Sequence, residues 1–193
     1  GAIGPGGRGV QELQHMIGAV DVVMGSFSKT FASNGGFVAT NNRSLKLALR
    51  YGAGPLTFTN SLSPVQASTI LTCLDIIDSP EGASRRADLM RNAALLREGL
   101  GAEGFDVLGT PSAIVPVILG DSRTSREMTR AMIGLGALVN LVEFPAVARN
   151  ACRWRLQVMA QHTESQIEQC VALAVRARRS VQRAAAARSF AAG

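Results

Sequence analysis

The chain has 193 residues, of which 47% are hydrophobic and 18% charged, so it is long enough to bury a core and has the composition of a folded α/β protein. Its three cysteines show neither C-x-x-C nor Cys/His spacing, which predicts reduced thiols and neither a disulfide framework nor a metal site. No apolar run has the length of a membrane span and no signal-peptide pattern opens the chain, so we expect a cytoplasmic location.

The first part of the sequence predicts short helices and strands in alternation. "VQELQHMI" (10–17) has helical spacing, and "VDVVMGSF" (20–27) is an apolar β-branched run that predicts a buried strand. "GGFVAT" (35–40) predicts a second strand, which makes the segment between them a strand-to-strand turn. A helix over 43–52, closed by a glycine, follows before an irregular segment.

Two longer helices come next, and strands then dominate. Pro64 opens an apolar helix over 64–77, and an amphipathic helix extends over 80–104. Thr163 and Gln166 have the spacing of a capping box at the start of the last helix. The elements expected after residue 104 are strands over 105–109, 112–121, 137–145 and 153–160 and helices over 125–136 and 163–179.

The change of pattern near residue 105 indicates two domains and a tail. We expect the end of a larger α/β domain over 1–78, a small α+β domain over 79–175 and a basic Ala/Arg-rich tail over 176–193. The net charge is +6, but five arginines lie in the tail and no nucleic-acid-binding signature accompanies them. We therefore expect a solvated helix end and no nucleic-acid partner. The glycine-rich, loop-like start leads us to expect a further N-terminal portion.

Lys29 departs from the preference of this chain for arginine. The sequence contains two lysines, Lys29 and Lys46, among 20 basic residues. A lysine can lose its proton and form an imine with a carbonyl group, whereas an arginine stays protonated. Lys29 is therefore a candidate for covalent chemistry, although this spacing alone also fits an exposed lysine in a turn.

The neighbours of Lys29 suit an anionic ligand. Hydroxyl groups at Ser26, Ser28 and Thr30, with the backbone amides of a turn, are donors appropriate to a phosphate. Gly35 and Gly36 allow the chain to pass close to a ligand or to a neighbouring backbone. These residues predict a phosphate-binding turn around the lysine.

Five segments in order resemble the α-oxoamine synthases, pyridoxal-phosphate (PLP) enzymes of fold type I such as 8-amino-7-oxononanoate synthase, 2-amino-3-ketobutyrate CoA ligase, 5-aminolevulinate synthase and serine palmitoyltransferase. The resemblance implies an α/β fold in which the end of a PLP-transferase large domain precedes a small α+β C-terminal domain. The segments are "GRG" (7–9), "VDVVMGSFSKTFASNGGFVAT" (20–40), "FTNSLSP" (58–64), "IVPVILGD" (114–121) and "RWRLQVMAQHT" (153–163).

The resemblance also implies roles for five residues. Lys29 matches the lysine that binds PLP covalently and then moves a proton at the substrate α-carbon, and Ser26 matches a phosphate ligand. Thr59 and Asn60 match a segment that reaches the cofactor phosphate of the neighbouring subunit, which implies a homodimer with shared active sites. Arg155 matches the arginine that binds the amino-acid carboxylate. Each position has a structural alternative. Ser26 could simply form a turn, Thr59 and Asn60 could lead into the helix at Pro64, and Arg155 could be a strand residue paired to a carboxylate.

The function implied is PLP-dependent decarboxylative condensation of an amino acid with an acyl-CoA or acyl-carrier thioester. The ring-stacking histidine and the aspartate that pairs with the pyridine nitrogen in this family match no residue here and are expected upstream of residue 1. The alternative interpretation is a non-catalytic subunit or fragment that binds a full-length homologous partner.

Overall fold

The computed structural model describes residues 1–191, and their contacts divide the chain into two compact units, Gly1–Arg86 and Ala87–Gly193. The division lies inside helix α5 (Pro80–Ala102), a short way after the expected boundary between residues 78 and 79. The last helix, α7 (Glu164–Ala191), continues through the basic tail. Residues 192 and 193 of that tail lie outside the described residues.

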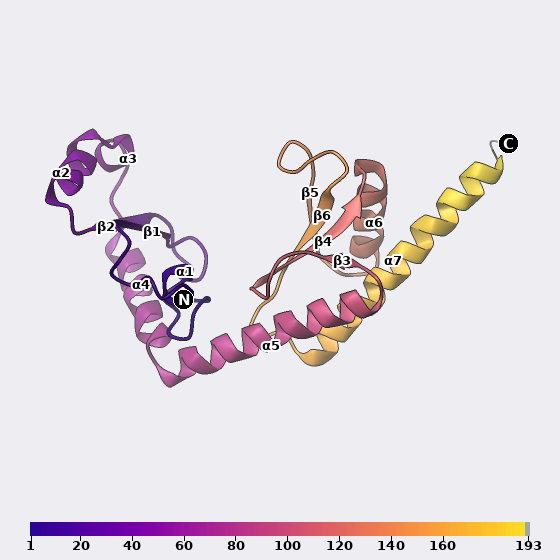
Figure 1. Ribbon diagram of the computed structural model, residues 1–193, viewed down its shortest axis with the longest axis horizontal. Helices are drawn as coiled ribbons and strands as arrows, with labels where there is room; N and C mark the ends of the chain where they lie inside the picture. Colours follow the sequence, from indigo (N-terminus) through magenta and orange to yellow (C-terminus); the bar gives the residue numbers. More distant parts are fainter. Residues whose placement is uncertain (192–193) are drawn as a thin grey trace. The chain divides into compact units, whose positions relative to one another are not determined.

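Unit 1 contains one β-hairpin and four helices (Figure 1). Strands β1 (Val22–Ser26) and β2 (Gly36–Thr40) pair antiparallel, with Val22 opposite Thr40 and Ser26 opposite Gly36. Two strands joined by a turn are what the sequence predicts. The helices are α1 (Val10–Leu13), α2 (Arg43–Gly52), α3 (Gly54–Thr57) and α4 (Pro64–Ile77).

Helix α4 begins and ends where the sequence predicts because its first turn carries strong local signals. The Ser63 hydroxyl accepts a hydrogen bond from the Gln66 amide at 3.3 Å, and the Gln66 side chain accepts one from the Ser63 amide at 2.8 Å. Pro64 occupies the first helical position, where an amide hydrogen has no partner within the helix.

Three local predictions for unit 1 are wrong. Helix α1 ends at Leu13, well short of residue 17, because His15 adopts a left-handed backbone with φ of 54°. The short helix α3 was not expected. Strand β1 is not buried: Met24 is 76% exposed, since β2 is its one partner strand in the described chain.

The apolar side chains of unit 1 are largely uncovered. Ile70 is the one hydrophobic residue among residues 1–86 whose exposed fraction, 6%, counts as buried. Many large apolar side chains of this unit are exposed instead, and we refer to them as the unit 1 apolar surface: Val10, Leu13, Met16, Ile17, Val20, Val22, Met24, Phe37, Val38, Leu47, Tyr51, Leu56, Phe58, Leu62, Val65, Leu71 and Leu74. An exposed apolar surface of this extent is typical of a surface that another polypeptide covers.

Unit 2 has a four-stranded antiparallel sheet with the order β3-β4-β6-β5 (Figure 1). Along β6 the buried residues Cys152, Trp154 and Leu156 alternate with Arg153, Arg155 and Gln157 on the opposite face. The strands are β3 (Asp106–Val107), β4 (Ile114–Gly120), β5 (Asn140–Val142) and β6 (Cys152–Gln157), and helix α6 (Ser122–Gly134) joins β4 to β5.

The core of unit 2 lies under one face of this sheet. Trp154 is fully buried, and its indole nitrogen donates to the Thr129 hydroxyl of α6 at 2.9 Å. The buried polar end of the tryptophan therefore has a partner. Other buried residues are Leu96, Leu100, Phe105, Val115, Val117, Met128, Met132, Ala174 and Ala177.

Two arginines of the tail have structural contacts. Arg178 donates to the backbone oxygens of Glu103 at 2.7 Å and Gly104 at 3.3 Å, and its guanidinium lies 4.2 Å from the centre of the Phe105 ring. Arg188 pairs with Glu127 of α6 at 3.0 Å. The tail is thus a helix attached to the small domain. None of the helices in residues 1–191 combines the length and apolar character that a membrane crossing requires.

Candidate functional site

Lys29 lies in the loop that joins β1 to β2, and this loop is closed by its own backbone. The Phe27 amide donates to the Gly35 oxygen, the Ser33 amide donates to the Phe27 oxygen, and the Ala32 amide donates to the Lys29 oxygen, each at 3.0 Å. These bonds fix the position of the lysine within the hairpin, as expected for the strand-to-strand turn.

Glycines allow the two strands to approach closely at the base of the loop. A Cβ atom at Gly36 would lie 2.5 Å from the Gly25 carbonyl oxygen, and one at Gly25 would lie 2.3 Å from the Phe37 ring. Gly35 has a φ of 79°, which side chains disfavour. The predicted close approach to a neighbouring backbone is confirmed for Gly36, whereas the atoms nearest to Gly35 belong to the Leu62 side chain.

Aromatic packing supports the same loop from within unit 1. The Phe27 ring centre lies 5.3 Å from that of Phe31 and 5.5 Å from that of Phe37. Pairs at this separation add about 0.5–1.5 kcal/mol beyond area burial. The loop therefore rests on a small aromatic cluster while its polar residues stay accessible.

The polar side chains around Lys29 face solvent. The hydroxyl oxygens of Ser26 and Ser28 are 2.8 Å apart, and the Ser28 amide donates to the Ser26 hydroxyl at 3.2 Å. Lys29 is exposed, and within residues 1–191 no ion pair engages its amine. Among the described residues the loop thus holds two hydroxyl groups and an amine without an acidic partner, groups that can donate to a phosphate and form an imine with an aldehyde.

The segment that contains Thr59 and Asn60 adjoins this loop through its last residues. The Gln66 side chain donates to the Asn34 side-chain oxygen, and a Cβ atom at Gly35 would lie 3.0 Å from the Leu62 side chain. Thr59 itself donates to the Pro55 backbone oxygen. Thr59 and Asn60 are exposed, and in the described chain no hydrogen bond joins them to Lys29.

Arg155 belongs to unit 2, on the face of β6 opposite the core. It lies across from Pro116 of β4 and Asn140 of β5 in the register of the sheet. The neighbouring arginine on the same face, Arg153, donates to the Ala151 backbone oxygen at 3.1 Å, whereas Arg155 is exposed and makes no such bond within residues 1–191. Of the two arginines, Arg155 is therefore the one with its guanidinium available.

A pocket of about 670 Å³ within unit 2 is lined by Arg155 and by polar groups from β5, β6 and α7. They include Asn140 and Gln157, and His162 of the turn between β6 and α7 also lines the pocket. His162 accepts a hydrogen bond from the Met159 amide at 3.3 Å, which gives this histidine a structural role in the turn. Cys170 also lines the pocket, and burial raises the pKa of its thiol, so this cysteine stays protonated and uncharged near neutral pH.

Sequence reasoning missed Asn92, which positions the turn between β6 and α7. Asn92 is 2% exposed on α5, and its side-chain nitrogen lies 2.7 Å from the His162 oxygen, 3.2 Å from the Met159 oxygen and 3.4 Å from the Ala160 oxygen. The available signal was a lone asparagine on the apolar face of an amphipathic helix. Such a residue in a core indicates buried acceptors elsewhere in the chain.

Comparison with solved structures shows the fold class. A high-resolution structure of SPT with PLP superposes with a TM-score of 0.86 at 35% identity, over 93% of this chain and 45% of that one. The expected α/β fold of a PLP-transferase, with a small C-terminal domain after part of the large one, agrees with this similarity.

Residues 4–173 match the family Aminotransferase class I and II, and the chain belongs to this family. Two curated relatives have the names that the sequence resemblance led us to expect. The 8-amino-7-oxononanoate synthase of Geobacter metallireducens is 35% identical over 90% of this chain, and the serine palmitoyltransferase of Sphingomonas paucimobilis is 36% identical over 94%. The chain spans less than half of their lengths, 44% and 43%.

Proposed function

We propose that the chain provides the covalent anchor and part of the substrate site of a PLP-dependent α-oxoamine synthase. The reaction is the decarboxylative condensation of an amino acid with an acyl-CoA or acyl-carrier thioester. The observation that carries the proposal is the amine of Lys29, held without an acidic partner in a closed loop beside two serine hydroxyls. Membership of the family and the similarity to the PLP-containing SPT structure support it.

The residues of the loop fit the cofactor by their chemistry. The Lys29 amine would hold the aldehyde carbon of PLP, and the Ser26 hydroxyl would donate to its phosphate. When bound, PLP supplies an electron sink for the pair of electrons left at the substrate α-carbon. Lys29 then takes up or returns the proton at that carbon, which its amine can do once it is deprotonated.

Arg155 would bind and orient the carboxylate of the amino-acid substrate. A guanidinium offers two parallel hydrogen bonds to a carboxylate, and the Arg155 guanidinium is free of the backbone bond that engages Arg153. Orientation of the carboxylate determines which bond at the α-carbon is aligned for cleavage. Arg155 therefore has a positioning and recognition role.

Thr59 and Asn60 would complete the phosphate site of a second subunit in a homodimer with shared active sites. Both residues are exposed and make no hydrogen bond to the lysine of their own chain within the described residues. This arrangement supports a role toward another chain. The cytoplasm is the proposed location.

The unit 1 apolar surface favours a second candidate function, in which the chain is a non-catalytic subunit or fragment bound to a full-length homologous partner. Such a partner would cover the exposed face of β1 and supply the parts of the relatives that this chain does not span. Association in this form does not require Lys29 to react, so the lysine chemistry separates the two candidates.

Reductive labelling tests the proposal, and Lys46 serves as a control within the same chain. The protein is incubated with PLP and treated with borohydride, and the modified amines are mapped by mass spectrometry. We expect weak overall labelling of this chain alone, but about tenfold more on Lys29 than on Lys46, because the serine hydroxyls add phosphate affinity near Lys29 only. Equal labelling of the two lysines would contradict the proposal.

The substrate role of Arg155 is tested with its neighbour as the matched control. Amino-acid binding to the PLP-treated protein is followed by the change in the cofactor spectrum. Arg155→Ala should weaken that binding about tenfold or more, since a charge-assisted pair is worth about 1.5–3 kcal/mol. Arg153→Ala should leave it near the unmodified value.

A further inference from the structure

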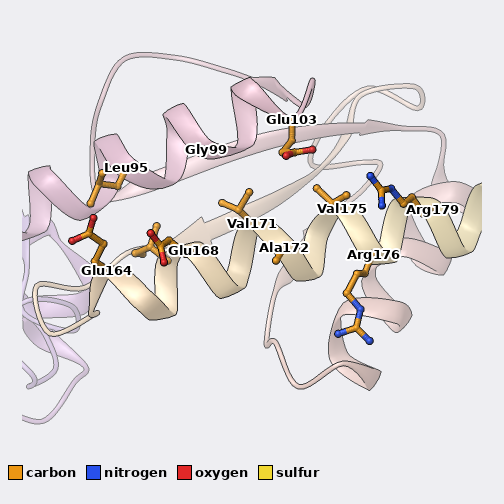
Figure 2. Close-up of a pocket in the computed structure, with 11 residues that line it drawn as sticks. Leu95, Gly99, Glu103, Glu164, Glu168, Val171, Ala172, Val175, Arg176 and Arg179 are labelled. Atoms are coloured by element: carbon orange, nitrogen blue, oxygen red, sulfur yellow. The ribbon is translucent and has the colours of Figure 1, made fainter.

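A surface groove in unit 2 lies between α5 and α7 and has a volume of about 530 Å³ (Figure 2). Its apolar centre is formed by Leu95 and Gly99 of α5 and by Val171, Ala172 and Val175 of α7. In Figure 2 the Val171 and Val175 side chains point toward α5. The two helices touch closely at one point, where a Cβ atom at Gly99 would lie 2.9 Å from the Val171 side chain.

Opposite charges occupy the two ends of this groove on α7. Glu164 and Glu168 lie at one end and Arg176 and Arg179 at the other, and Figure 2 shows the two pairs separated by the apolar centre. All four side chains are exposed, and among residues 1–191 no ion pair joins any of them to another side chain. Glu103, which follows the last residue of α5, also lines the groove.

The charge pattern on α7 is self-complementary. Glu164 and Arg179 are equidistant along the helix from the point between Val171 and Ala172, and Glu168 and Arg176 are equidistant from Ala172. A rise of 1.5 Å per residue places Glu164 and Arg179 about 22 Å apart. Two copies of α7 laid antiparallel about a two-fold axis at this point would therefore place each acidic residue beside an arginine of the other copy.

We propose that this groove is an interface between two copies of the chain, related by a two-fold axis near Ala172. The contact is isologous, so each of the two acid–base pairs occurs twice. The half-buried Val171 and the exposed Ala172 would meet their equivalents at the axis, which removes apolar surface from water.

Two of the other three tail arginines are engaged elsewhere, which separates this interface from a general basic tail. Arg178 binds the end of α5 and Arg188 pairs with Glu127, so Arg176 and Arg179 remain available on the groove side. A polyanion would be attracted by the arginines but repelled by the glutamates of the same groove. A second copy satisfies both charges. The interface lies in unit 2, apart from the segment proposed above to complete a neighbouring subunit's active site.

Charge reversal on the full chain tests the proposal. One variant carries Arg176→Glu and Arg179→Glu, and another carries Glu164→Arg and Glu168→Arg. Each replaces four attractions across the axis by repulsions, so sedimentation velocity should show at least a tenfold weaker self-association at low salt. A mixture of the two variants should associate at least as tightly as the unmodified chain, because one groove is then entirely acidic and the other carries four arginines against one glutamate, Glu103.

The controls separate this effect from misfolding and from other contacts. Fluorescence of the single tryptophan, Trp154, reports the fold of unit 2 in each variant. Arg43→Glu with Arg50→Glu on α2 gives the same change of net charge outside the groove and should leave association unchanged. If neither reversal weakens self-association relative to the α2 control, or if the mixture associates no better than either variant alone, the proposal is overturned.

Discussion

Replacement of Asn92 by alanine should destabilise unit 2 and loosen the turn that follows β6. The asparagine nitrogen carries two hydrogens, and the nearest acceptors are the His162 oxygen at 2.7 Å and the Met159 oxygen at 3.2 Å. Alanine removes both donors, so the His162 oxygen loses its side-chain partner, whereas the Met159 oxygen keeps the hydrogen bond from the His162 amide at 3.2 Å. The turn connects β6, the strand of Arg155, to α7. The residues that line the Arg155 pocket should therefore also become less ordered.

The magnitude follows from the burial of the site. An unsatisfied buried polar group costs about 1–3 kcal/mol, and the missing amide leaves a small cavity in addition. We expect the free energy of unfolding to fall by about 2–4 kcal/mol. With an m-value of about 1–3 kcal/mol per molar for a small domain, the urea midpoint should fall by about 1–2 M.

Urea unfolding followed by Trp154 fluorescence measures this directly, because the single tryptophan is buried in the same unit. Asn92→Asp should be at least as harmful, since it places a carboxylate against carbonyl oxygens. Arg91→Ala on the exposed side of the same helix removes only a surface pair with Asp88 and should change stability by less than about 0.5 kcal/mol. An Asn92→Ala midpoint equal to that of Arg91→Ala would refute the reasoning.

Two further predictions concern the hairpin and the start of α6. Gly36→Ala places a Cβ atom 2.5 Å from a backbone oxygen across the hairpin and should abolish the labelling preference for Lys29, whereas Gly52→Ala, with open space around it, should retain it. Hydrogen bonds from the Thr124 amide and hydroxyl lower the pKa of Asp121, so its stabilisation is full above its unfolded pKa and disappears as pH falls through its folded pKa. The stability gap between the unmodified protein and Asp121→Asn, read from urea midpoints, should therefore narrow from pH 7 to about pH 3. A gap that is independent of pH would show that the charge contributes nothing.

Local signals explain which elements were predictable. Helix α4 matches the expected 64–77 because Pro64 and the Ser63–Gln66 pair set its first turn. The last helix begins as predicted for the same reason. The Thr163 amide donates to the side-chain oxygen of Gln166 at 2.9 Å, as the Ser63 amide does to Gln66 at the start of α4. These signals act between residues a few positions apart, so the sequence displays them directly.

Features that depend on residues far apart in the sequence were harder to predict. The burial of β1 could not be inferred from its apolar sequence, because burial depends on which neighbours cover the strand. Asn92 acquires its role from acceptors about seventy residues later in the chain. The choice between Arg153 and Arg155 as the available guanidinium became visible only when the bond from Arg153 to the Ala151 oxygen was seen.

The unit 1 apolar surface has a calorimetric consequence. The heat capacity of unfolding arises mainly from apolar surface that becomes hydrated, and unit 1 already exposes much of that surface in its folded form. Thermal unfolding of the isolated chain should therefore show a smaller heat-capacity increment than the usual value of about 12–15 cal/mol/K per residue. The heat capacity missing from unfolding should reappear, with negative sign, in titration calorimetry when a polypeptide binds to β1 and its neighbouring helices.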